Sequence, residues 1–300
     1  MKSDTALLNE IAHNTGLLRN LSEEESTSLK KILLGIHNDI IKICDRYGLK
    51  VMVSGGTCLG SIRHKGYIPW DDDLDFIMPR NDYEKLLSIY ENGDIDSKYL
   101  FEYPNKYKDV KNTFLKIFLK GTKLKEVFDD SDSFPSCIFV DVFPIDYAPK
   151  NKFLRRVRAF ISDSLQFICT SVLYYKYPSN NLKLLYEQDQ KVYRRYKVRL
   201  LIGQVFSVIP HKKWVYWFDS FNRKSQLSTV MTVPSGRRHY YSEALPDKVF
   251  LPPIESTFEG CKTYLPHEPH TYLANLYGNY MRIPPVEKRE RHFVVDFKID

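Results

Sequence analysis

The hydrophobic pattern opens with a long amphipathic helix between Ser22 and Gly48. Apolar side chains recur there every three or four residues, from Leu29 to Tyr47, and so share one face of a helix. Ser22 and Glu25 have the spacing of a capping box, and Gly48 stands where a helix C-terminal cap is favoured. The pattern predicts one helix of about seven turns, packed through its apolar face.

Shorter apolar runs alternate with helical patterns through residue 150. Strands are predicted at residues 49–53, 74–78, 99–103, 114–119 and 137–143. Helices are predicted at 57–63 and at 83–90, the second capped by Asn81. Helices that alternate with strands predict an α/β or α+β fold.

The charge distribution changes in the middle of the chain. Residues 150–224 contain 16 Lys and Arg against 4 Asp and Glu, whereas the other residues contain 28 basic against 33 acidic side chains. The pattern is mostly helical there, and the part that follows is rich in proline and turns, with one helix near 271–277. We therefore expect a core at 1–150, a basic and aromatic helical segment at 151–230, and a C-terminal segment at 231–300 that folds back on the core.

The composition is that of an ordinary globular protein. The 300 residues are 43% hydrophobic and 27% charged, which excludes a disordered, collagen-like or polytopic membrane protein. The net charge of +7 suits anionic partners without requiring nucleic acid. Five scattered cysteines without C-x-x-C spacing, and an N-terminus without the apolar core of a signal peptide, predict reduced thiols and a cytoplasmic protein.

Two glycines mark a candidate phosphate site. Gly55 and Gly56 follow a predicted strand and open a predicted helix. Paired glycines let a ligand approach the backbone closely, and the N–H groups at a helix start favour phosphate. Alone, such a pair is more often only a tight turn.

An acidic run from Asp71 to Asp75 follows at the head of the next predicted strand. Because alternate strand residues share a face, Asp73 and Asp75 project together, and Asp71 can follow them. Clustered carboxylates repel one another unless a cation lies between them, and such oxygen ligands suit Mg²⁺ or Mn²⁺. An EF-hand is excluded, because Phe76 stands where that loop needs glycine. The alternative is a solvated acidic loop.

A further predicted strand carries Asp141 inside an apolar run, where an unpaired charge is costly. Basic side chains that could bind phosphate are Arg63, His64, Lys65 and Lys116. Asp141 can instead be a structural ion-pair partner, and Lys116 can point outward. Together, strand, glycine pair, helix and the later strand carboxylates predict metal-dependent phosphate chemistry.

The stretch GGTCLGSIRHKGYIPWDDDLDF at residues 55–76 resembles the signature of the LicD/fukutin family, within the nucleotidyltransferase superfamily typified by DNA polymerase beta. The resemblance continues through VDVFPID at 140–146 and returns loosely at 277–285 and at His292. It implies a nucleotidyltransferase-like α/β (α+β) fold, with a small mixed sheet flanked by helices and the basic helical segment added to it.

The resemblance also implies an activity: transfer of a phospho-alcohol, such as phosphocholine or ribitol phosphate, from a CDP-linked donor to a hydroxyl of a cell-surface glycan, with release of CMP. Mg²⁺ (or Mn²⁺) would bind Asp73, Asp75 and Asp141, and Asp71 is the candidate general base. The expected donor and phosphate contacts are Gly55, Gly56, Thr57, Arg63, His64, Lys65 and Lys116, with Arg282 and His292 as C-terminal contributors.

Residues 191–217 interleave basic and aromatic side chains, and more than one interpretation stays open. They can be solvated helix faces over core aromatics, or a peripheral contact with the inner face of an anionic plasma membrane that holds a lipid-linked glycan acceptor. Nucleic-acid binding is not expected. Two other functions also stay open: a nucleotidyltransferase that moves NMP to a small acceptor, and a non-catalytic glycan- or membrane-binding protein on the same fold.

Overall fold

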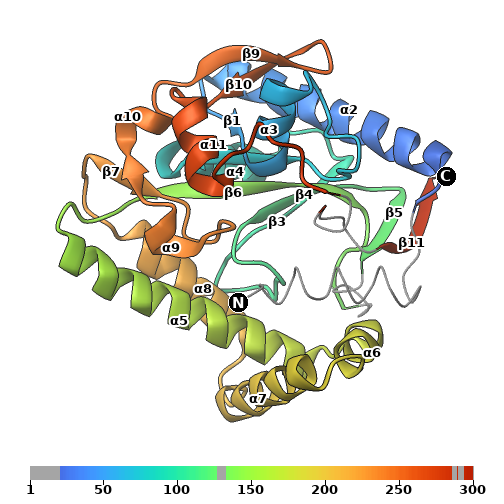
Figure 1. Ribbon diagram of the computed structural model, residues 1–300, viewed down its shortest axis with the longest axis vertical. Coiled ribbons are helices and arrows are strands. Elements are labelled where there is room, and N and C mark those ends of the chain that lie inside the picture. The colour runs from blue at the N-terminus through green and yellow to red at the C-terminus, as the bar shows by residue number, and fades with distance from the viewer. Residues whose placement is uncertain (1–20, 127–132, 286–288, 290–293, 300) are drawn as a thin grey trace.

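A computed structural model describes residues 21–126, 133–285, 289 and 294–299 (Figure 1). The long N-terminal helix α2 (Glu23–Tyr47) is confirmed together with both of its caps. The Ser22 hydroxyl accepts a hydrogen bond from the Glu25 N–H at 3.1 Å, and the Glu25 carboxylate accepts one from the Ser22 N–H at 2.9 Å. Gly48 ends the helix at φ 62°, a left-handed conformation that favours glycine.

A mixed sheet forms the centre of the molecule, in agreement with the α/β or α+β fold that the alternating pattern predicts. Its strands run in the order β1 (Met52–Val53), β2 (Asp75–Pro79), β6 (Ile138–Tyr147), β4 (Leu115–Leu119) and β3 (Tyr99–Glu102). Strands β2 and β6 are parallel, and the other neighbours are antiparallel. Beyond this row, β7 (Val230–Thr232) pairs with the end of β6 and with β8 (Leu245–Pro246).

Two smaller strand pairs were not predicted from the sequence. Strand β5 (Thr122–Glu126) pairs with β11 (Val294–Ile299), and β9 (Ile254–Phe258) forms a hairpin with β10 (Cys261–Leu265). Strand β6 is also longer than predicted, because it continues past residue 143 to pair with β7.

The helices that follow the first two strands begin earlier than predicted. Helix α3 (Gly55–Arg63) begins at the glycine pair, so both glycines lie in its first turn. Helix α4 (Arg80–Glu91) begins directly after β2, and its N-cap is Pro79. The predicted Asn81 cap is therefore wrong, because the chain passes from strand to helix with no intervening residue at which Asn81 could act.

The two faces of the sheet have different roles. Helix α2 covers one face, where its His37 ring stacks on Phe76 at 5.5 Å between ring centroids. Because neighbouring strand residues point to opposite faces, Asp75 points to the other face. The C-terminal helix α11 (Pro269–Tyr277) packs against α3, and the short helices α9 (His239–Ser242) and α10 (Asp247–Phe250) lie in the same C-terminal part.

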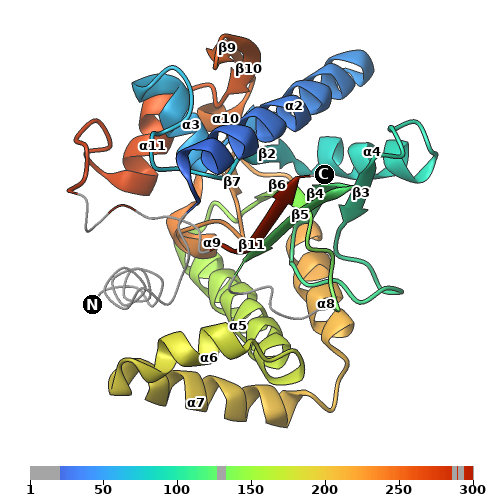
Figure 2. The ribbon, with the colours of Figure 1, turned by 90° about the vertical axis from the view of Figure 1, so that its right-hand side faces the viewer.

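The basic segment forms a separate helical layer, at the bottom of Figures 1 and 2 and on the opposite side of the molecule from the β9–β10 hairpin. Its helices are α5 (Lys152–Lys176), α6 (Asn180–Glu187), α7 (Gln190–Phe206) and α8 (His211–Arg223). Small apolar clusters, to which Val110 and Val295 contribute from outside the segment, hold these helices together.

A buried ionic network joins this layer to the sheet. The Arg80 guanidinium makes two hydrogen bonds of 2.7 Å to the Asp146 carboxylate on β6 and one of 2.8 Å to Asp219 on α8. Asp146 and Asp219 are 1% and 2% exposed, so this contact lies well inside the protein. One guanidinium thus connects α4, the central strand and the helical layer.

Candidate active site

Four charged side chains lie in one row across the sheet. The strand register pairs Asp75 on β2 with Asp141 on β6, Asp141 with Lys116 on β4, and Lys116 with Glu102 on β3. Residues paired across neighbouring strands project to the same face, so the row lies on the face opposite α2. The two strand carboxylates singled out in the sequence are therefore direct neighbours.

Lys116 contacts the Asp141 carboxylate from the strand on the other side of β6 from Asp75. Its Nζ atom donates a hydrogen bond of 3.3 Å to Oδ2 and lies 2.9 Å from Oδ1, an ionic contact without hydrogen-bond geometry. The same ammonium lies 3.3 Å from the centroid of the Phe139 ring. Burial raises the pKa of Asp141, and the Lys116 charge opposes that shift.

The glycine pair lets the acidic loop approach the start of α3. Gly55 has φ 51°, and a Cβ atom there would lie 3.1 Å from the Asp75 Oδ2 atom. A Cβ on Gly56 would clash with the Asp71 carboxylate. The Gly55 N–H donates a 3.4 Å hydrogen bond to the Tyr272 hydroxyl of α11. Any larger residue at these two positions would displace the carboxylates.

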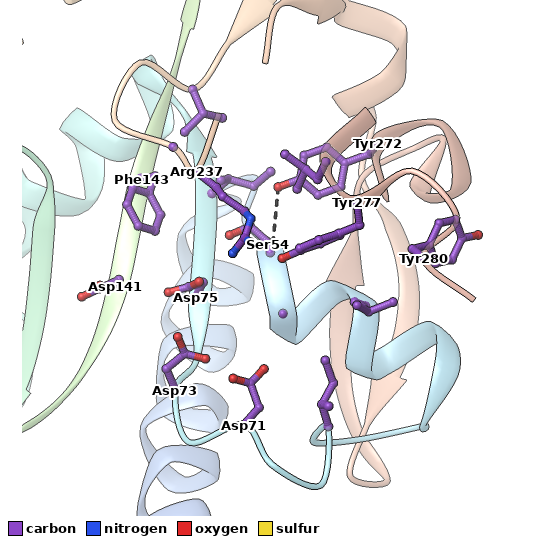
Figure 3. Close-up of a pocket in the computed structure, with 18 of the residues that line it drawn as sticks. Ser54, Asp71, Asp73, Asp75, Asp141, Phe143, Arg237, Tyr272, Tyr277 and Tyr280 are labelled. Atoms are coloured by element: carbon purple, nitrogen blue, oxygen red, sulfur yellow. Dashed lines mark hydrogen bonds between the residues drawn. The ribbon is translucent and has the colours of Figure 1, made fainter. Parts of the chain in front are cut away.

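These residues line a cleft of about 560 Å³ between the sheet and the C-terminal segment (Figure 3). Figure 3 shows Asp71, Asp73 and Asp75 gathered beside the start of α3, with Tyr277 facing them, while Asp141 on the neighbouring strand is turned away from them. Gly55, Gly56, Arg63 and Arg282 also line this cleft. It thus brings together seven predicted site residues, besides Asp141, from distant parts of the chain.

The C-terminal wall adds residues that the sequence analysis missed. Arg237 lies 5.2 Å from the Tyr277 ring centroid, and Arg289 lies 4.2 Å from that of Trp70. Burial raises the pKa of Tyr277, and the carboxylates of the acidic loop add to that shift. Neither arginine belongs to a recognisable sequence motif, and only the fold brings the two side chains to the cleft.

Arg63 is held at the edge of the cleft by its neighbours. Its guanidinium donates a 2.6 Å hydrogen bond to the Tyr280 carbonyl, and its Nε–H donates to the His64 Nε2 atom at 2.9 Å. Burial lowers the pKa of Arg63, and the Asp71 charge opposes this. The side chain thus links α3 to the C-terminal wall while its guanidinium lines the cleft.

Glu243 is a buried carboxylate in the same wall. It is 3% exposed, and its Oε1 atom accepts a 2.7 Å hydrogen bond from the Arg238 N–H. Burial raises the pKa of this carboxyl to about 7, although the arginine-bearing loop opposes the shift. Gly236 is required for this contact, because a Cβ there would overlap the carboxylate. Glu243 therefore fixes the loop that carries Arg237.

Four of the predicted contacts lie outside the cleft lining, although they are close to it in sequence. Thr57 is buried, and its hydroxyl accepts a 2.9 Å hydrogen bond from the Asp75 N–H, which fixes the start of β2. Lys65 is exposed at φ 63° in the turn after α3. His64 bonds Arg63, and Lys116 pairs with Asp141. His292 lies outside the described residues.

The oxygen donors for a divalent cation are present but not yet arranged around one point. Within the part of the chain that the structure describes, no three His, Cys, Asp or Glu side chains stand at the spacing of metal ligands. Asp71, Asp73 and Asp75 nevertheless line one cleft, and carboxylate oxygens are the ligands that Mg²⁺ prefers. The donor set fits such a cation, whereas Asp141 is held by Lys116.

Comparison with known proteins supports an enzyme class, transferases of phosphate-containing groups, and relates the chain to one family. Residues 48–162 match the LicD/FKTN/FKRP nucleotidyltransferase domain. The chain is also 23% identical over 270 residues to the lipopolysaccharide cholinephosphotransferase LicD of Haemophilus influenzae, covering 88% of this chain and 94% of that protein. The resemblance to this family that was seen in the sequence is thus confirmed over residues 48–162.

Shorter matches involve two uncharacterised proteins. One, from Rickettsia prowazekii, is 29% identical over 125 residues, which are 40% of this chain and 45% of that protein. The other, from Rickettsia typhi, is 36% identical over 55 residues, or 18% of this chain and 16% of that protein. Separately, none of the helices in the described residues is both long and apolar enough to cross a membrane.

Proposed function

We propose that this protein transfers a phospho-alcohol from a CDP-linked donor to a hydroxyl group of a lipopolysaccharide or related cell-surface glycan, on a fold of the nucleotidyltransferase type. The donor diphosphate would lie between the acidic loop and the C-terminal arginines. Support for the substrate class comes from the Haemophilus relative, whose name describes phosphocholine transfer to lipopolysaccharide.

One observation carries the proposal. Asp71, Asp73 and Asp75 meet the glycine-rich start of α3 in one cleft, and Arg237 lies on the opposite wall. Carboxylates that hold a cation, helix N–H groups and a guanidinium are all groups that bind a diphosphate. Thr57 fixes the β2 backbone at Asp75, so the carboxylate is held in place before any ligand arrives.

In the proposed reaction, the acceptor oxygen forms a bond to the phosphorus that carries the alcohol, and the bond from that phosphorus to the CMP oxygen breaks. The electron pair leaves with CMP, and the acceptor proton passes to a carboxylate, for which Asp71 is the candidate. Mg²⁺ held by Asp73 and Asp75 would neutralise charge on the diphosphate and the departing CMP. Asp141 is the expected third ligand, for which Lys116 competes.

The test is to incubate the protein with CDP-choline, CDP-ribitol or CDP-glycerol and a lipopolysaccharide acceptor, and to follow the products by phosphorus NMR with Mg²⁺ and with EDTA. We expect CMP to be released from one donor, only when the divalent cation is present. Release of pyrophosphate from a nucleoside triphosphate would instead identify a nucleotidyltransferase. If no donor is consumed or bound, the non-catalytic alternative replaces the proposal.

Two neighbouring aspartates give a matched pair of variants. Asp75→Asn removes a cleft carboxylate, and we expect turnover to fall at least about 100-fold. Asp72→Asn changes the same charge at a residue that does not line the cleft, and turnover should stay within about threefold of the original protein. Equal losses in the two variants would contradict the assignment of Asp75.

A further inference from the structure

The outer surface of the helical layer exposes apolar side chains in an ordered stripe. On α7 and the turn that follows it, Val198, Leu201, Val205 and Val208 are 56%, 61%, 60% and 84% exposed. Their spacing of three and four residues places them on one side of the helix. Scattered exposed apolar residues are ordinary, but an aligned row on one helix face marks a contact surface.

A second stripe on α5 meets the first. Phe153, Phe160 and Phe167 recur every seven residues and are 71%, 75% and 41% exposed. Phe167 and Val198 line a shared groove of about 360 Å³. The two stripes thus meet at this groove, and we call them together the α5–α7 face. Helices α5 and α7 lie at the bottom of Figures 1 and 2.

Cationic side chains border this apolar surface. Arg194, Arg195 and Arg199 line the groove, and the Arg199 guanidinium lies 4.9 Å from the Phe167 ring centroid. Lys191 and Lys197 are exposed on the same helix. Guanidinium groups beside an apolar groove match a ligand that has an anionic head and an apolar body.

The aromatic residues expected at a membrane interface are mostly used elsewhere. Trp214 and Phe218 on α8 are 7% and 2% exposed, and Tyr196 on α7 is 4% exposed. Residues 191–217 thus divide into an inward half that builds small cores and an outward half of aliphatic and basic side chains, to which Trp217, 40% exposed, adds one aromatic ring. The α5 phenylalanines, outside that segment, complete the outward surface.

We propose that the α5–α7 face docks on the surface of an anionic lipid bilayer, with α7 lying along the membrane and its arginines at the headgroup phosphates. A second copy of the chain is a poorer partner, because residues 150–224 carry 16 basic against 4 acidic side chains and two such surfaces would repel. Nucleic acid fits less well, because the exposed apolar side chains of α7, which lie beside the arginines, are aliphatic and offer no stacking surface for bases.

Flotation with phospholipid vesicles tests this proposal without any catalytic assay, so its failure and that of the proposed function are separable. We expect the protein to bind vesicles of phosphatidylcholine with phosphatidylglycerol at least about tenfold more tightly than pure phosphatidylcholine, and less tightly as salt increases. Leu201→Glu with Val205→Glu, and separately Arg194→Glu with Arg195→Glu, should each lower binding at least about tenfold.

The matched control is Lys31→Glu with Lys42→Glu on α2, which makes the same charge change on exposed residues outside the helical layer. This variant should keep more than half of the binding. Equal loss in the control, or no preference for anionic vesicles, would overturn the proposal. A concentration-dependent dimer in light scattering, dissolved by the Leu201 and Val205 changes, would assign the face to a second copy instead.

Discussion

The ammonium of Lys116 decides how much of Asp141 is available to a ligand. Both groups lie in the row across the sheet, and Lys116 is 7% exposed. We expect Lys116→Met to lower the free energy of unfolding by about 3 kcal/mol, because the Asp141 carboxylate, whose side chain is only 15% exposed, would lose its counterion. Urea unfolding measures this, and adding Asp141→Asn should recover at least half of the loss. A double variant no more stable than the single one would contradict a direct pairing.

Gly55 is required both for its backbone conformation and for the space that it leaves beside Asp75. A comparison with Gly121 separates these two requirements. Gly55 and Gly121 both have positive φ, 51° and 81°, so alanine should cost each about 1 kcal/mol of unfolding free energy. Only at Gly55 would the new Cβ press on Asp75 Oδ2, while Gly121 has nothing within 4 Å. We expect Gly55→Ala to lower donor turnover at least about tenfold and Gly121→Ala to leave it unchanged. Similar turnover in both variants would contradict this role.

Glu243 makes stability depend on pH. Its folded pKa of about 7 exceeds the ordinary value of 4.5, so between these values the folded protein holds a proton that the unfolded chain releases. The unfolding free energy should therefore fall as pH rises through this window, by up to about 3 kcal/mol from this group. Glu243→Gln should flatten that part of the profile, measured by urea unfolding at several pH values. An unchanged slope would contradict the assignment.

At the residue scale, the sequence predicts the groups that stand in one local stretch. Asp71, Asp73 and Asp75 were found because strand alternation and a nearby glycine pair are visible in a short window. Arg237 and Glu243 were not, since each gains its meaning from contact with residues far away in the chain. Residue type alone left open whether Lys116 points outward or into the site, and the structure pairs it with Asp141.

At the scale of elements, the sequence predicted helices and strands with a strong hydrophobic periodicity and missed strands in which that periodicity is weak. Helix α2 has an apolar stripe and two caps, and its structure agrees with the prediction in each respect. Strand β5 is short and rich in lysine, and the β9–β10 hairpin alternates only partly, so neither stood out from a loop. These strands are stabilised by pairing with their neighbours, and that context cannot be predicted from their own sequences.

The Arg80 network gives a prediction about how elements are joined. Arg80→Met would leave the buried Asp146 carboxylate without its cation and the buried Asp219 carboxylate with Arg223 alone. We expect a loss of about 4 kcal/mol in unfolding free energy, measured by denaturant titration. Arg46→Met, on the exposed surface of α2, is the control and should change stability by less than about 0.5 kcal/mol. A loss below about 1 kcal/mol for Arg80→Met would show that packing alone joins the layers.

At the scale of the whole molecule, a ligand that bridges the cleft should stabilise the protein through both walls. At a concentration of 100 times its Kd, a CDP-linked donor with Mg²⁺ should add about 2.7 kcal/mol, a rise of several degrees in Tm. Arg237→Ala should reduce this rise at the same ligand concentration, because it removes a cation from the C-terminal wall. Differential scanning fluorimetry measures the effect. A full rise in the variant would contradict a bridging contact.

The two walls of the cleft are synthesised at different times, because they come from distant parts of the chain. One wall comes from residues 54–75 and the other mainly from 233–289, with the helical layer between them in the chain. A ribosome releases the acidic loop long before it releases Arg237, and domains fold as their residues emerge. The nascent protein therefore carries its carboxylates without their facing arginines until the residues of the C-terminal wall have been made.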